Sequence, residues 1–134
     1  MPRIEEPAEP WRSFFADVDS RLSEDVQLHC CGGFVAVTVA TPPENYEDRL
    51  VPMFPSAWRR LQLFALEAHD LALSKLERNG DRDRDDVQQL ARAGHLRPEV
   101  LKERYFSELR PNLLAHETRH DLTLQLWLES YWPL

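Results

Sequence analysis

Hydrophobic residues begin to recur every three or four positions at Trp11, after a polar start. The positions that follow this spacing are Trp11, Phe14, Phe15, Val18 and Leu22. Such spacing places them on one face of a helix. Residues 1–10 instead hold three Glu, three Pro and little apolar surface, so burial cannot offset the entropy lost on ordering them. The pattern therefore predicts a flexible tail over 1–10, followed by a helix.

Two apolar runs of strand length come next, separated by paired glycines. Val26 to Cys31 is the first run, Gly32 and Gly33 interrupt it, and Phe34 to Ala40 is the second. The pattern predicts a strand, a tight glycine turn, and then a short helix or another strand. Further on, Arg49–Phe54 and Arg60–Leu66 are compatible with β-structure. The proline-containing segment between them predicts a hairpin.

Helical spacing dominates from Glu67 onward. The first predicted helix ends at Asn79-Gly80, the second is capped by Asp81 or Asp83 and ends at Gly94, and the third opens at Pro98. Residues 121–128 alternate apolar and polar positions as strands do, but they are rich in leucine and poor in β-branched residues. We interpret them as the end of a helix, with a strand as the alternative.

These elements predict an α+β fold, with a small sheet in the first half and a mainly helical C-terminal half. The chain has 134 residues, a length typical of one compact domain. We therefore expect a single domain over 11–134, in which residues 11–66 form an α/β part and 67–134 a helical region.

Charge and composition exclude several classes of function. The 23 acidic residues exceed the 16 basic ones, giving a net charge of −7, which argues against a nucleic-acid partner held through many phosphates. No stretch approaches the roughly 18 apolar residues of a membrane span, and the start does not resemble a secretory signal. Cys30 and Cys31 are adjacent and cannot close an ordinary disulfide loop, which fits a reducing compartment. We expect a cytoplasmic protein without a membrane partner.

One string matches a known metal motif. His116, Glu117 and His120 spell H-E-x-x-H, in which two histidines one helical turn apart bind zinc and the glutamate acts as general base. A catalytic zinc needs a third protein ligand, and the fourteen residues after His120 include no further histidine. An exposed helix turn that happens to spell the motif is the alternative.

A second cluster combines basic and acidic residues around a predicted helix–helix connection. Asp83 and Asp86 are three positions apart and share a helix face, opposite Lys75 and Arg78 on the preceding helix. Such a face could hold a metal–nucleotide complex. The alternative is a solvated helical hairpin whose charge pairs contribute little to stability.

Four segments stand out when they are taken in order. They are Gly32 to Ala36, Tyr46 to Leu50, Phe64 to Arg78 and Arg82 to Val87. In this order, behind a helix and a strand, they resemble a bacterial family of uncharacterised nucleotidyltransferase-like proteins related to abortive-infection and toxin–antitoxin nucleotidyltransferases. The resemblance covers nearly the whole chain from Trp11 and is strongest from Tyr46 to Val87.

The resemblance implies a small mixed sheet with helices, followed by a helical region. It implies that Gly32 and Gly33 cradle the triphosphate of an NTP, and that Lys75, Arg82, Asp83 and Asp86 support the site. The implied reaction moves a nucleotidyl group from an NTP to a hydroxyl, which requires carboxylates that hold Mg²⁺.

The chain departs from this family where the metal should bind. The family's Asp-x-Asp strand is expected soon after the glycines, but no acidic residue occurs from Phe34 to Pro43. Asp17-Val-Asp19 has the right letters but lies on a predicted helix, where such residues point apart. We therefore expect a truncated, catalytically inactive protein that keeps nucleotide or partner binding.

Three alternatives stay open. One is an active Mg²⁺-dependent nucleotidyltransferase that uses Glu44, Asp48 or the Asp83/Asp86 pair. The others are a zinc hydrolase and a helical interaction module. The apolar face of that module would consist of Leu122, Leu126, Trp127 and Trp132. The expected partners are an NTP, a protein, or a second copy of the chain, because truncation leaves sheet edges unpaired.

Overall fold

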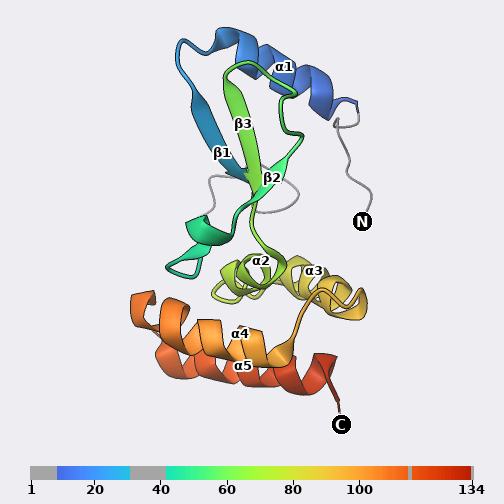
Figure 1. The fold of residues 1–134 in the computed structure, drawn as a ribbon. Coiled ribbons are helices and arrows are strands. Elements are labelled where there is room, and N and C mark those ends of the chain that lie inside the picture. Colours follow the sequence, from blue (N-terminus) through green and yellow to red (C-terminus); the bar gives the residue numbers. More distant parts are fainter. Residues whose placement is uncertain (1–8, 31–41, 115, 134) are drawn as a thin grey trace. The chain divides into compact units, whose positions relative to one another are not determined.

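The computed structural model describes residues 9–30, 42–114 and 116–133 (Figure 1). The fold class is α+β, as predicted. The described residues fall into two compact units, one within Met1–Val35 and Leu50–Leu66, the other within Ala36–Arg49 and Glu67–Leu134. Most of the predicted tail and the whole glycine turn lie outside the described residues, so both stay predictions.

The first unit contains a helix and a three-stranded sheet (Figure 1). Helix α1 spans Trp11–Arg21, and the strands are β1 (Val26–Cys30), β2 (Val51–Met53) and β3 (Leu61–Ala65). The central strand β3 pairs in parallel with β1 and antiparallel with β2. The helix, the first strand and the hairpin are confirmed. The three-residue strand β2 is an edge of the described sheet and contains Pro52.

Apolar side chains and one carboxylate hold this unit together. Phe15 on α1 is buried with Leu61 and Leu63 on β3. The carboxylate of Asp19 accepts backbone N–H groups at the start of β3, from Arg60 at 2.6 Å and Leu61 at 2.8 Å. These hydrogen bonds lower the pKa of Asp19. Asp19 therefore fixes helix α1 to the strand.

The second unit is helical. It contains η1 (Tyr46–Arg49), α2 (Ala68–Ser74), α3 (Asp81–Arg92), α4 (Pro98–Arg104), η2 (Tyr105–Leu109), η3 (Arg110–Asn112) and α5 (Glu117–Tyr131). Arg49, predicted to start a strand, lies instead in a short 3₁₀ turn. Residues 121–128 are helical, as interpreted from their leucine content. No helix in the described ranges is both long and apolar enough to cross a bilayer.

The boundaries of α3 include one correction. Its N-cap residue is Gly80, not Asp81 or Asp83. Asp83 lies one turn inside the helix and accepts the Gly80 backbone N–H at 2.9 Å, so the predicted capping carboxylate acts from the third helical position. The predicted stop is confirmed, because Gly94 adopts a φ of +80° just after the helix.

The core of this unit is built from helices α2 to α5. Its buried members are Ala72, Leu73, Leu76, Val87, Leu96, Leu101, Tyr105, Leu109, Leu113, Leu124 and Trp127. Trp127 also donates its indole N–H to the side chain of Asn79 at 3.1 Å. Leu122 and Leu126 are instead about half exposed. The four residues expected to form one apolar interaction face therefore do not share a face.

Candidate functional site

The basic and acidic residues around the α2–α3 connection do come together. Lys75 follows the last residue of α2, and its Nζ lies 3.0 Å from Asp86 Oδ2 and 4.0 Å from Asp83 Oδ1. Arg78 contacts the same Asp83 carboxylate. The predicted juxtaposition of these four side chains is confirmed, but α2 ends at Ser74 and not at Asn79-Gly80, so Lys75 and Arg78 lie in the connection and not on the helix. The role of the four residues stays a prediction.

Asp83 has no carboxylate oxygen to spare. Arg78 donates to Oδ2 from Nε at 2.7 Å and to Oδ1 from Nη2 at 2.6 Å, and the Gly80 amide also bonds Oδ2. The side chain is buried, and the bonds from Arg78 lower the pKa of Asp83. Asp83 therefore has a structural role: its carboxylate binds the α2–α3 connection to the first turn of α3.

Arg82 on α3 adds a further cation next to Asp83, and Lys75 and Arg82 are the two cations that we expect a ligand to use. The side chain of Lys75 is only 9% exposed, but that of its partner Asp86 is 39% exposed. Arg82 is exposed and has no hydrogen bond or ion pair among the described residues. An anion could therefore contact Arg82 directly, and could reach Lys75 by displacing Asp86. We refer to Lys75, Arg82, Asp83 and Asp86 as the α2–α3 cluster.

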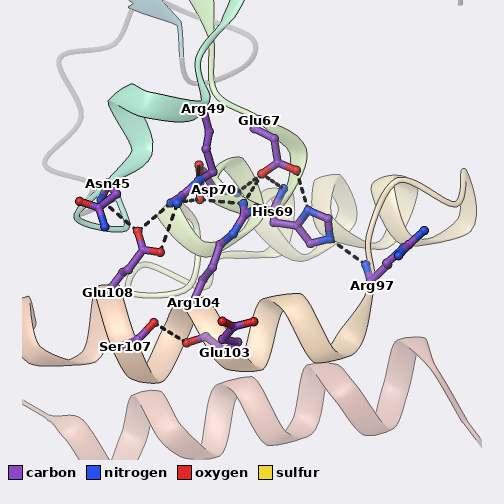
Figure 2. A network of polar contacts seen from close by, with 10 residues as sticks. All are labelled: Asn45, Arg49, Glu67, His69, Asp70, Arg97, Glu103, Arg104, Ser107 and Glu108. Atoms are coloured by element: carbon purple, nitrogen blue, oxygen red, sulfur yellow. Dashed lines mark hydrogen bonds and ion pairs between the residues drawn. The ribbon is translucent and has the colours of Figure 1, made fainter.

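A second polar network, which sequence reasoning missed, surrounds Arg49 (Figure 2). The guanidinium donates to both oxygens of Asp70, at 2.7 and 2.9 Å, and to both oxygens of Glu108, at 3.2 and 2.8 Å. These bonds raise the pKa of Arg49, and Asp70 is fully buried. Glu108 also accepts the backbone N–H of Asn45 at 2.9 Å. The network thus joins η1, α2 and η2.

The same network continues to the start of α4 (Figure 2). Glu67 caps α2 by accepting the N–H groups of His69 and Asp70, and it pairs with Arg104. His69 Nε2 lies 2.8 Å from the backbone N of Arg97, which donates to it. Nδ1 must therefore carry the ring proton, and it donates to Glu67 Oε1 at 2.6 Å. The carboxylates of Glu67, Asp70 and Glu108 are each paired with an arginine, so the network has a structural role.

The H-E-x-x-H string is divided between solvent and core. His116 is exposed and precedes α5 in a left-handed conformation, with φ at 62°. Glu117 is exposed and lies 3.7 Å from Arg110. His120 is 2% exposed, and its Nδ1 has no hydrogen-bond partner among the described residues. Burial lowers the pKa of His120. Within the described part of the chain, no three His, Cys, Asp or Glu side chains gather as a metal site would require.

Gly32 and Gly33 lie outside the described residues, so their predicted place beside the α2–α3 cluster is not tested. The comparisons with known proteins are informative for one family. The family described as nucleotidyltransferase of unknown function (DUF6036) matches residues 33–130, a range that includes both polar networks. No curated protein and no solved structure gives a significant match.

Proposed function

The chain belongs to this nucleotidyltransferase family, and we propose that it binds a nucleotide through Lys75 and Arg82 without transferring it. The substrate class is a nucleoside triphosphate, the ligand on which the family's named reaction acts. Partnership with a toxin or antitoxin stays a prediction of the resemblance.

The Lys75–Asp86 pair, in which Lys75 is buried and Asp86 is partly exposed, carries the binding half of the proposal. Lys75 Nζ is 3.0 Å from a carboxylate whose side chain is 39% exposed. A phosphate oxygen can replace that carboxylate and keep the charge of Lys75 compensated. Arg82 lies on α3 four positions before Asp86. Its planar guanidinium offers several N–H donors, an arrangement that suits phosphate.

The distribution of carboxylates supports the absence of transfer. Nucleotidyl transfer depends on metal ions held against the phosphates, and Mg²⁺ requires oxygen ligands in near-octahedral geometry. No acidic residue occurs from Phe34 to Pro43, where the family's metal-binding pair is expected. In the second unit, Asp83 is occupied by Arg78, and Asp70 by Arg49 and Arg104. A carboxylate already bound by guanidinium groups is a poor ligand for a second cation.

Nucleotide titrations of the full chain test the binding half. Each common NTP is titrated by calorimetry with and without Mg²⁺, using the parent protein and the Arg82→Ala variant. Removing one charge-assisted contact should weaken binding by about tenfold. Arg92→Ala removes the same side chain from the exposed end of α3 and should bind as the parent does. If no NTP binds, or if both variants bind alike, the binding proposal is wrong.

A labelling assay tests the other half. The protein is incubated with α-labelled NTPs, Mg²⁺ or Mn²⁺, and RNA or protein acceptors, and we expect no label transfer. The active alternative has one structural argument, namely that Asp86 is the accessible carboxylate of the α2–α3 cluster. Transfer that is lost in Asp86→Asn but kept in Asp85→Asn, an exposed neighbour, would establish that alternative.

A further inference from the structure

Within the described part of the second unit, one side of helix α5 is exposed and carries an ordered set of side chains. Its members are Arg119, Leu122, Leu126 and Glu129, all of them exposed. They are three, four and three positions apart, so they align along a single stripe of the helix. We call these four residues the α5 stripe. The core-facing side of α5 holds different residues, including Leu124 and Trp127.

The centre of the α5 stripe is apolar. Leu122 and Leu126 are one helical turn apart and are 53% and 51% exposed. The buried residues of α5, which include Leu124 and Trp127, lie on the other side of the helix. The core therefore does not depend on Leu122 or Leu126. Two half-exposed leucines four positions apart have the spacing of the a and d positions of a coiled coil, which a facing helix covers.

The two ends of the α5 stripe carry opposite charges without opposite-charge partners. Among the described residues, the Arg119 guanidinium approaches the ring nitrogen of His120 at 3.5 Å, and the Glu129 carboxylate accepts a bond from Gln125 at 3.1 Å. Neither forms an ion pair within the described ranges of the chain. A partner surface that supplied the complementary charges would therefore find both groups available.

The α5 stripe is complementary to the α5 stripe of a second copy that runs antiparallel to it. The spacing of three, four and three is the same in both directions, so a second α5 helix running antiparallel places Leu126 opposite Leu122. The same register places Glu129 of that copy opposite Arg119, and Arg119 of that copy opposite Glu129. A parallel arrangement would instead oppose arginine to arginine and glutamate to glutamate. Self-complementarity of this kind is what a two-fold interface requires.

We propose that two copies of this chain associate through the α5 stripe, with the α5 helices antiparallel about a two-fold axis. Leucine contacts supply the apolar seam, and the two Arg119–Glu129 pairs set the direction and the register. The inference does not depend on nucleotide binding, because the α5 stripe shares no residue with the α2–α3 cluster.

Sedimentation velocity of the full chain, over a concentration series, tests this interface. The parent should pass from monomer to dimer as concentration rises. Arg119→Glu converts two attractive pairs into two repulsive ones and should weaken the dimer by about tenfold or more. Lys102→Glu makes a comparable charge reversal on an exposed position of α4 and should leave the dimer intact.

The decisive variant is the exchange Arg119→Glu with Glu129→Arg. It restores complementarity only if the helices are antiparallel, so dimerisation should return to within a few-fold of the parent. Leu122→Gln with Leu126→Gln should abolish the dimer, while circular dichroism shows that the exposed substitutions leave the helices folded. A parent that stays monomeric throughout, a dimer insensitive to these leucines, or a charge exchange without rescue would overturn the proposal.

Discussion

Arg49 and Asp70 form a two-pronged ion pair, with Nε 2.7 Å from one carboxylate oxygen and Nη2 2.9 Å from the other. Asp70 is fully buried, and its second cation, Arg104, lies 3.2 Å away. The pair fastens the 3₁₀ turn η1 to helix α2 within the second unit. Because the carboxylate has no contact with solvent, its charge depends on these two arginines for compensation.

Replacing Arg49 should therefore destabilise the second unit strongly. Loss of one partner from a buried pair costs about 3–5 kcal/mol, and we expect Arg49→Met to fall near the lower limit because Arg104 remains. Urea unfolding followed by circular dichroism measures the change. Arg84→Met removes the exposed ion pair with Asp81 and should cost less than about 1 kcal/mol. If both variants lost the same unfolding free energy, the buried pair would contribute no more to stability than the exposed one.

Acid should destabilise the protein partly through Asp83. Its hydrogen bonds from Arg78 lower the pKa of the folded carboxyl, so the stabilisation is present above the unfolded pKa, about 3.9, and is lost as pH falls below it. In Asp83→Asn we expect a loss of about 1–2 kcal/mol at neutral pH and a shallower decline of the unfolding free energy in acid. Unfolding titrations from pH 7 down to about pH 3 compare the two profiles. An unchanged acid profile would contradict this assignment.

Alkali should act through Tyr105. Burial, together with its hydrogen bond to Asp121, raises the pKa of the phenol above its usual value of 10.0. The folded state then retains a proton that the unfolded state loses, so stability declines as pH rises above 10. By pH 11 this group should account for about 1.4 kcal/mol. Tyr105→Phe should lack that part of the decline in alkaline urea titrations, and a full decline in the variant would refute the prediction.

His120 should weaken the protein in mild acid. Burial, with nearby Arg119 adding to it, lowers the pKa of the imidazole below its ordinary 6.5, while Glu77 and Asp121 oppose the shift and His116 adds to it. A base with a lowered folded pKa loses its stabilisation as pH falls below the unfolded value. The Nδ1 atom has no hydrogen-bond partner in the described part of the chain, so His120→Leu should raise the unfolding free energy by about 1 kcal/mol and remove this part of the pH dependence.

The control for that experiment is His95→Gln, at an exposed position, which should unfold as the parent does. Metal analysis of both purified proteins adds a separate readout. Stoichiometric zinc in the parent that disappears in His120→Leu would favour the zinc-site hypothesis over a buried neutral imidazole.

Local spacing predicted most of the elements because each depends on neighbours within one or two helical turns. The pattern from Trp11 predicted α1, and the glycine at position 94 ended α3 as expected. The inward-facing residues were harder to predict. On α5 the sequence suggested one face containing both Leu126 and Trp127, but only Trp127 enters the core, because neighbouring helices decide which side is covered.

The polar contacts of Arg49 could not be predicted from local spacing, because its partners are far away in the sequence. Arg49 is 21 positions from Asp70 and 59 positions from Glu108, and nothing in the spacing of single charged residues identifies such partners. By contrast, Asp83 and Asp86 were recognised because they are one helical turn apart. Strand pairing follows the same rule, since the adjacent strands β2 and β3 were predicted, whereas the parallel pairing of β3 with β1, 35 positions earlier, was not.

Pro52 limits how far the sheet of the first unit can grow. Exposed edge strands recruit other strands through their unpaired N–H and C=O groups, and this is the route to amyloid-like stacking. The described edge strand β2 has only three residues, and Pro52 has no amide hydrogen to offer. This margin of the sheet is therefore a poor template for fibrils, even in a concentrated solution of the protein.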